Sequence, residues 1–583
     1  MIPVFYCNLS LKLGNFLVSR GQKKGNFGTS DFFNLRAIGM RQKTIIITLL
    51  ISSMLAFQLN AQRKGLKSIQ ERDLKMHMDF LASDELEGRA TGETGLEIAA
   101  RYLAVQSERL GLQPAPSEDD YFQYYTLQER TYDLEKSSIT LQDSSGEKMV
   151  SQQQFFLLPG LRTDHIEIEG EVVFAGYGIN DKQFNYSDFE GVDIRDKIVL
   201  IMNRAPMNKE GTASQFGDKY SDMQSMQHKM PYIAAQQPRA IIMVFDPKSG
   251  NNSIEDMNPR IADYLATSRS LKKEDEEPVT EIPGPKIILA HRSVADEVMH
   301  AAGKSLEEVQ QEIDNTLEPK SFLVDGLTAR IELTMKNDDL EVPNVFGMIE
   351  GSDPELKNEI VMYLAHFDHV GTDPEGSVFN GADDNASGTV ALLEIAEAFL
   401  AERKMPRRSI GFLWVSGEEI GLFGSAYFAD HSMVSTEQIS TVINLDMVGR
   451  VAEPEDRESE RNGLTIVGED TVKVIGAKQS AMLMEINEAT LEDMGLHGNY
   501  SYNDITHPER YYYRSDHISF ARKDIPVLFY STGTHADYHM LTDDPGKIAY
   551  DKFRRMTEFS FMVGYNVADY KDEITVDNPM SGW

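Results

Sequence analysis

The chain has 583 residues, of which 41% are hydrophobic and 26% are charged, and its formal net charge at neutral pH is −35. This length exceeds what a single hydrophobic core normally serves, so we expect two or three domains of ordinary globular composition. The acidic balance argues against nucleic acid as a partner, because phosphate recognition needs a basic surface. The only cysteine is Cys7, which excludes an intramolecular disulfide and a thiolate metal cluster.

The first recognisable pattern in the chain starts at Met40. Two basic residues precede an apolar run at 45–57, and a polar segment with a plausible cleavage position after Ala61 follows it. A charged region followed by a short apolar region predicts a secretory signal peptide rather than a membrane span. We therefore expect residues 1–61 to be an upstream extension and a signal peptide, with Met40 as the true initiator. The mature protein is predicted to be periplasmic or secreted, without a stable membrane anchor.

Two helical patterns follow this leader. Residues 69–81 and 96–110 carry apolar side chains at the spacing that places them on one face of a helix. The loop between them, 83–92, contains two glycines and is as compatible with a plain connection as with a functional role. We assign residues 62–135 to the N-terminal helical part of the larger domain.

From residue 136 to residue 335 the pattern changes to short β-rich runs separated by polar turns. The runs lie at 170–178, 197–202, 240–245 and 286–289. Such runs predict a β-rich domain inserted into a larger one. This part of the sequence shows no catalytic grouping.

The remaining residues, 336–583, alternate between strand and helix patterns. Apolar runs typical of buried strands lie at 359–365, 410–415, 442–445 and 526–530, and helical patterns lie at 390–400, 472–494 and 552–567. Strands that alternate with helices predict an α/β fold, here a largely parallel mixed sheet with helices on both faces.

Acidic and imidazole side chains follow the predicted strands of this part. They include His366, Asp384, Glu418, Glu419, Asp446 and His539. Taken singly, an acid pair can compensate a helix dipole and a lone histidine is commonly a structural hydrogen-bonding residue. Together, side chains at the carboxyl ends of strands share one crevice of an open α/β sheet. Without a cation, desolvation of these charged groups and repulsion between the acids would cost free energy. The pattern therefore predicts a site for zinc or a similar divalent metal.

Several short motifs occur in a characteristic order. They are HFD at 366–368, GADDNASG at 381–388, GEE at 417–419, NLDM at 444–447 and DYH at 537–539. In order and context they resemble the co-catalytic zinc aminopeptidases of peptidase family M28. The segment LASDELEGR at 81–89 looks like one near the start of those catalytic domains, and residues 136–335 are similar to the protease-associated domain that many of them carry.

The resemblance implies a two-metal centre. Asp384, followed by a cis peptide bond, would bridge two zinc ions. One ion would also be bound by Glu419 and His539, and the other by His366 and Asp446. Zinc fits these ligands, although manganese and cobalt also do.

The resemblance also implies roles around the metals. Asp368 would orient His366, and Glu418 would be the general base that takes a proton from a water held between the ions, which supplies a bridging hydroxide. Tyr538 would donate a hydrogen bond to the carbonyl oxygen of the substrate, but a packed aromatic is an equally good interpretation. His369 and His535 match no role in the family, and we interpret them as structural or rim residues.

These features predict an exported di-zinc aminopeptidase that hydrolyses N-terminal residues from peptides. Two alternatives stay open: a glutaminyl cyclase-like aminoacyltransferase of related fold, and a non-catalytic receptor-like binding protein. The full ligand set and the presence of Glu418 favour the peptidase, because a binding surface has no use for a base beside two metals. The sequence does not determine the preferred N-terminal residue or the oligomeric state.

Overall fold

The computed structural model describes residues 64–116, 118–151, 155–158, 164–220, 225–272, 284–452 and 464–579. The expected signal peptide and Cys7 lie outside these ranges. Residues Gly65–Trp583 form one compact unit. Within the described ranges, no helix combines the length and the apolar character needed to cross a membrane.

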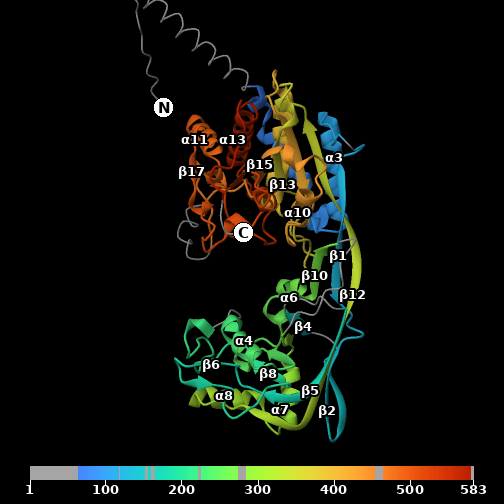
Figure 1. Ribbon diagram of the computed structural model, residues 1–583, viewed down its shortest axis with the longest axis vertical. Coiled ribbons are helices and arrows are strands. Elements are labelled where there is room, and N and C mark those ends of the chain that lie inside the picture. Colours follow the sequence, from blue (N-terminus) through green and yellow to red (C-terminus); the bar gives the residue numbers. More distant parts are fainter. Residues whose placement is uncertain are drawn as a thin grey trace, which may run out of the picture. The chain divides into compact units, whose positions relative to one another are not determined.

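A mixed sheet carries the strands predicted in the second half of the chain (Figure 1). Its order is β17 (His497–Asn499), β16 (Thr471–Ile475), β18 (Val527–Ser531), β15 (Ile439–Leu445), β13 (Ile360–His366), β14 (Ser409–Val415) and β12 (Phe322–Ile349). Strands β18, β15, β13 and β14 run parallel, whereas β16 and β12 are antiparallel to β18 and β14. The predicted α/β fold with a largely parallel mixed sheet is confirmed.

Helices cover both faces of this sheet, because alternate residues of β13 point to opposite sides. Tyr363 belongs to a core that includes residues of α9 (Gly388–Ala401) and α13 (Tyr550–Ala568). Met362 belongs to a second core with α10 (Phe423–Asp430) and α12 (His517–Ala521). The first core also contains residues of the expected N-terminal helices, α2 (Glu71–Leu81) and α3 (Thr94–Leu110), and of α11 (Ala481–Met494).

The prediction of one helix over 472–494 is wrong in its first part. Residues Thr471–Ile475 form the strand β16, and the helix α11 begins only at Ala481. Gly476 adopts a positive φ that ends the strand, and the Ser480 side chain caps the helix by accepting a hydrogen bond from the backbone of Leu483. A short apolar run suits a strand and a buried helix equally, so periodicity alone misassigned it.

The strand β12 is 28 residues long and belongs to two sets of pairings. Its last part pairs with β1 (Phe122–Tyr132) and β14, and its first part pairs with β5 (His165–Phe174) and β2 (Ser138–Asp143). Beyond β5 the strands β8 (Ile198–Met202), β9 (Ala240–Val244), β11 (Lys286–Ala290) and β4 (Phe155–Leu158) follow in order. The strands predicted from the four β-rich runs are thus present.

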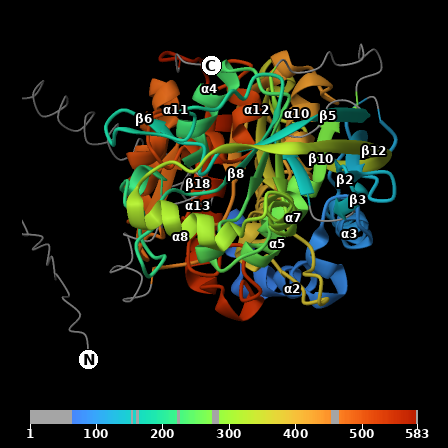
Figure 2. The ribbon, with the colours of Figure 1, turned by 90° about the horizontal axis from the view of Figure 1, so that it is seen from below.

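The buried residues between Ile139 and Met335 form hydrophobic clusters of their own. Helices α4 (Met226–Ala235), α7 (Ser293–Ala301) and α8 (Leu306–Thr316) contribute to them, and α7 packs against β12 and β3 (Gly146–Ser151), as Figure 2 shows from below. Between β9 and β11, the helices α5 (Ile254–Met257) and α6 (Pro259–Ala266) are followed by a strand that the sequence patterns did not predict, β10 (Thr267–Leu271), which pairs with β1. The insert boundaries at 136 and 335 stay a prediction.

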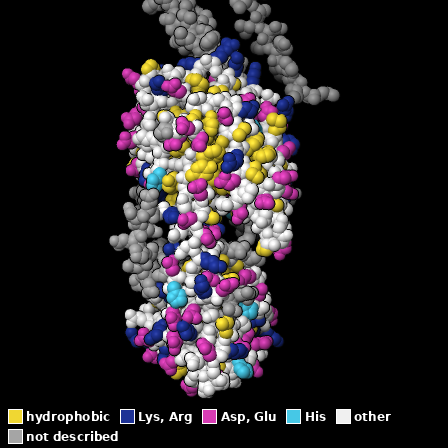
Figure 3. Space-filling view, turned by 90° about the vertical axis from the view of Figure 1, so that its right-hand side faces the viewer, with side chains coloured by type: hydrophobic (Ala, Val, Ile, Leu, Met, Phe, Trp, Pro, Cys, Tyr) yellow, Lys and Arg dark blue, Asp and Glu magenta, His cyan; other side chains and the backbone are white. Residues whose placement is uncertain are grey.

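Hydrophobic side chains also gather on the upper part of the face drawn in Figure 3, the side on which α3 and β1 lie in Figure 1. Ile98 and Val105 of α3 and Tyr124 of β1 are among the exposed large hydrophobic residues.

Candidate active site

The carboxyl ends of neighbouring strands bring the predicted metal ligands together. His366 is the last residue of β13, and Asp446 directly follows β15. Glu418 and Glu419 lie in the turn after β14, and His539 lies in the loop after β18. Asp384 precedes α9, and its peptide bond to Asn385 is cis, as the resemblance implied.

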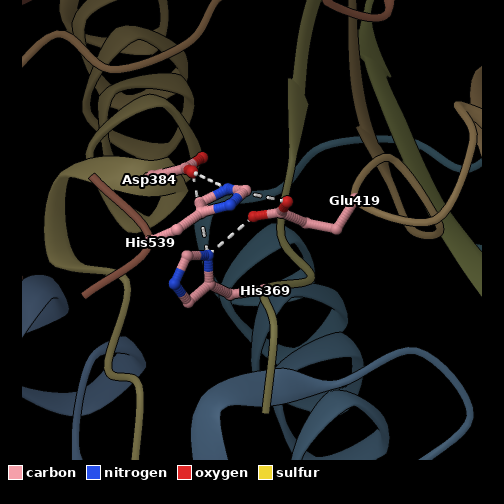
Figure 4. Close-up of side chains that lie close together, drawn as sticks. All are labelled: His369, Asp384, Glu419 and His539. Carbon is pink, nitrogen blue, oxygen red and sulfur yellow. Dashed lines mark hydrogen bonds and ion pairs between the residues drawn. The ribbon is translucent and has the colours of Figure 1, made fainter. Parts of the chain in front are cut away.

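Figure 4 shows the first group of converging side chains. The Nε2 atom of His539 lies 3.0 Å from Oδ2 of Asp384 and 2.9 Å from Oε2 of Glu419. The Nδ1 atom of His369 lies 2.7 Å from the other carboxylate oxygen of Glu419. Four possible metal-binding side chains therefore meet around one point.

A second group adjoins the first through Asp384. The Nε2 atom of His366 lies 3.5 Å from Oδ1 of Asp384 and 3.6 Å from Oδ1 of Asp446. Glu418 also lies within reach of His366 and Asp446. Asp384 thus turns one oxygen to each group, which is the geometry that a bridging carboxylate requires.

The chemistry of these side chains fits two divalent metals. His366 is only 1% exposed, and its Nε2 atom has no hydrogen-bond partner among the residues that the structure describes. A buried imidazole nitrogen that faces carboxylate oxygens without a hydrogen bond is available to a cation. Burial lowers the pKa of His539, but Glu419 and Asp384 outweigh burial and raise that pKa to about 10. The negative charges of Glu419 and Asp384 favour the binding of a metal cation between them in the same way.

Asp368 contacts both His366 and the acidic turn. The Nδ1 atom of His366 lies 3.2 Å from the backbone carbonyl oxygen of Asp368 and 3.6 Å from its carboxylate. The carboxylate accepts hydrogen bonds from the backbone N–H groups of Glu418 and Glu419, at 3.2 and 3.3 Å. Asp368 therefore contacts His366 through its carbonyl group and the Glu418–Glu419 turn through its side chain.

Glu418 and Tyr538 flank the ligands. Burial, together with Asp516, Glu419 and Asp446, raises the pKa of Glu418 well above its ordinary value, although His366 opposes this shift. Tyr538 stacks on His539 with ring centroids 3.9 Å apart. Both side chains line a small cavity that also reaches Asp384 and Asp446.

A larger cavity, of about 450 Å³, opens on the other side of the ligands. His369, Glu419 and His539 line it together with Thr91 and Phe379. Ile261 of α6 and two residues of β10, Thr267 and Arg269, complete its wall. Of the proposed ligands, Asp384 and Asp446 line the small cavity, and Glu419 and His539 line the large one.

Arg89 is a site residue to which sequence reasoning gave no role. Its buried guanidinium donates hydrogen bonds to the backbone carbonyl oxygens of Phe367, Asn380 and Gly381, at 2.8, 2.8 and 3.0 Å, and also to that of Leu81. It thereby ties the loop of His366 to the loop of Asp384. The resemblance at 81–89 was the only signal that could have identified it.

A second buried network supports the loop that carries Asp384. Oδ2 of Asp543 accepts hydrogen bonds from the backbone N–H groups of Asp383 and Asp384, at 2.9 and 3.1 Å. His535 lies with its Nε2 atom 3.2 Å from Oδ2 of Asp383. His535 thus lies beside the loop that carries Asp384, and its structural interpretation stays a prediction. Asp543 carried no sequence signal.

Part of the chain matches a known family. Residues 344–563 match peptidase family M28. Leucine aminopeptidase 2 of Trichophyton equinum is 27% identical over 215 residues, which are 36% of this chain and 38% of that protein. A probable zinc metalloprotease of Pyricularia oryzae is 32% identical over 129 residues, which are 22% of this chain and 24% of that protein. The chain thus matches well under half the length of these relatives.

Solved structures of similar fold include two bacterial aminopeptidases. The aminopeptidase from Aneurinibacillus sp. strain AM-1 is 16% identical, with 89% of this chain and 98% of that chain covered and a TM-score of 0.48. BSAP, a zinc aminopeptidase from Bacillus subtilis, is also 16% identical, with 87% and 98% covered and a TM-score of 0.45.

Proposed function

Because residues 344–563 match peptidase family M28, we propose that this chain is a zinc-dependent aminopeptidase that removes residues from the N-termini of peptides. One observation carries the proposal. The carboxylate of Asp384 presents one oxygen to His539 and the other to His366, so two ligand groups share it. A side chain in this arrangement suits two adjacent metal ions.

The proposed ligands divide into two sets. Asp384, Glu419 and His539 would hold one zinc ion, and Asp384, His366 and Asp446 would hold the other. Zinc at such a site supplies a Lewis acid for the scissile carbonyl group and lowers the pKa of water toward ~7. Three carboxylates compensate most of the charge of two dications.

The side chains outside the ligand sets would move protons and hold the substrate. Glu418 is adjacent to Glu419 but not needed as a ligand, so its carboxylate is free to take a proton from the attacking water and pass it to the departing amine. Burial raises the pKa of Glu418 well above its ordinary value, which favours a carboxylate that accepts a proton. The Tyr538 hydroxyl lines the same cavity and would donate to the carbonyl oxygen.

The proposal includes the rest of the chain. The small cavity would receive the N-terminal residue of the peptide, and the large one would receive the part that follows. Residues 136–335 would form a protease-associated-like insert, supported by their separate hydrophobic clusters. A leader that starts at Met40 would direct export, and N-terminal sequencing of the mature protein tests that point.

Substitution of Glu418 tests the mechanism. We expect Glu418→Gln to lower kcat by about 10²–10⁴-fold, because proton transfer is lost while the shape of the side chain is kept. The zinc content, measured by atomic emission, should stay at two per chain. The exposed Glu437 provides the control Glu437→Gln, which should match the wild type. A Glu418→Gln enzyme with wild-type turnover contradicts the role of Glu418.

A substrate panel tests the activity itself. Aminoacyl substrates, peptides and N-terminal glutaminyl peptides are incubated with the zinc-loaded chain, and the products are identified by mass spectrometry. Release of the first residue supports the aminopeptidase. Loss of ammonia from glutaminyl peptides alone would instead indicate a cyclase, and the absence of any turnover would refute both enzymatic functions.

A further inference from the structure

His369 is not a member of the proposed ligand sets, yet it contacts one of the ligands directly. Its Nδ1 atom lies 2.7 Å from Oε1 of Glu419, the oxygen that faces away from His539 (Figure 4). This distance is typical of a hydrogen bond from a ring N–H group to a carboxylate. The two oxygens of Glu419 therefore have different partners.

The surroundings of His369 enclose its ring closely. The side chain is buried, and the backbone N–H group of His369 donates to the carbonyl oxygen of Arg89 at 3.1 Å. The ring lies against Gly381, where a Cβ atom would come within 2.5 Å of two ring carbons. Gly381 also has a positive φ, so a larger residue is excluded there on two grounds. The chain thus leaves space for this ring in the loop that leads to Asp384.

We propose that His369 is a positioning residue that donates a hydrogen bond to Oε1 of Glu419 and so presents Oε2 to the metal bound by His539. This inference rests on the metal sets of the proposed function. Without the donor, the Glu419 carboxylate is free to rotate, and an ordered single-oxygen ligand becomes a mobile one. Partners that orient a metal ligand typically contribute about 10–100-fold to metal affinity.

A matched pair of substitutions isolates the hydrogen bond. His369→Asn places an amide nitrogen near the position of Nδ1 and retains a donor, whereas His369→Leu has nearly the same branched shape and no donor. Both remove the same ring, so packing losses are shared. The exposed His300 on α7 provides a control, His300→Leu, far from the strand ends that carry the ligands.

Metal affinity is the measurement. The full chain is stripped of metal and titrated with zinc in competition with a chromogenic chelator, which yields two stepwise dissociation constants. The variants His539→Ala and His366→Ala assign each step to one set of ligands. We expect His369→Leu to weaken the His539 step about 10–100-fold and to leave the His366 step close to the wild type. His369→Asn should recover most of the loss.

Three results would overturn the inference: wild-type zinc affinity in His369→Leu, equal weakening in the Asn and Leu variants, or equal weakening of both steps. Equal weakening in the two variants, or of the two steps, would indicate that His369 has a general structural role or that its imidazole binds zinc directly. A wild-type chain that binds two zinc ions but cleaves no peptide would refute the proposed function while leaving the role of His369 measurable. Failure of the wild type to bind two zinc ions would refute the proposed metal centre first.

Discussion

A single buried cation, Arg89, connects the two loops on which the proposed metal bridge depends. Its guanidinium binds the carbonyl oxygen of Phe367, which lies between His366 and Asp368, and the carbonyl oxygens of Asn380 and Gly381 before Asp384. The planar guanidinium has five N–H donors, whereas a lysine ammonium is a point charge with three. Burial lowers the pKa of Arg89 to about 10, so the group stays charged at neutral pH.

We expect Arg89→Lys to lower the free energy of unfolding by about 3 kcal/mol or more, because several carbonyl groups lose a charged donor in a buried place. Thermal unfolding followed by circular dichroism measures the loss. Zinc affinity should fall as well, since the Arg89 guanidinium then no longer connects the loop of His366 to the loop of Asp384. Arg101→Lys on the exposed side of α3 serves as the control. Equal midpoints for Arg89→Lys and the control would show that the four carbonyl contacts contribute little.

At the level of elements, the helices α2 and α9 bury an ionisable pair between them. The Nε2 atom of His77 on α2 lies 3.7 Å from Oε1 of Glu394 on α9. Burial lowers the pKa of His77 to about 4 and raises the pKa of Glu394 to about 8. Near pH 7 the helices therefore pack with both side chains predominantly neutral.

The raised pKa of Glu394 determines in which direction the free energy of unfolding changes with pH. The folded state retains a proton that the unfolded chain releases near its ordinary value of 4.5, so this carboxyl group costs stability as the pH rises from 4.5 to 8. Glu394→Gln removes that cost. We expect its free energy of unfolding to equal that of the wild type below pH 4.5 and to exceed it by about 2–4 kcal/mol at pH 8.5.

Thermal midpoints at several pH values measure this difference. Glu437→Gln, at an exposed position, removes a similar charge and should show no comparable pH dependence. A difference between Glu394→Gln and the wild type that does not change with pH would contradict the assigned protonation.

At the scale of the whole molecule, the proposed metal centre draws ligands from distant parts of one sheet. They span residues 366–539 and come from the ends of β13, β14, β15 and β18. Without cations, the carboxylates of Asp384, Glu419 and Asp446 repel one another in a buried place. Metals bound at the proposed centre would therefore also stabilise the fold.

Metal removal should affect activity and stability together. We expect a chelator to abolish turnover and to lower the thermal midpoint, and zinc at 1,000 times its dissociation constant to restore about 4 kcal/mol of stability. Differential scanning calorimetry and a peptidase assay on the same samples measure both. Full activity after exhaustive chelation would refute the metal centre.

Local patterns predicted much of the architecture. The strands β13, β14, β15 and β18 and the helices α2, α3, α9 and α13 were expected close to their observed bounds, because burial periodicity is a property of neighbouring residues. The strand β10 and the start of α11 were not, since short apolar or mixed runs fit more than one element. The order of short motifs also indicated which side chains would meet, and the structure brings these five proposed ligands together.

The sequence by itself determined the fold class, because burial periodicity is a property of neighbouring residues. Its resemblance to peptidase family M28 indicated the proposed ligands and the loop that carries Asp384, because the order of short motifs can be read along the chain. Only the tertiary structure decided the contacts of Arg89, Asp543 and His369. Each of these residues acts on a partner far away in sequence, and no local pattern encodes which distant carbonyl group or carboxylate the packed chain will place beside it.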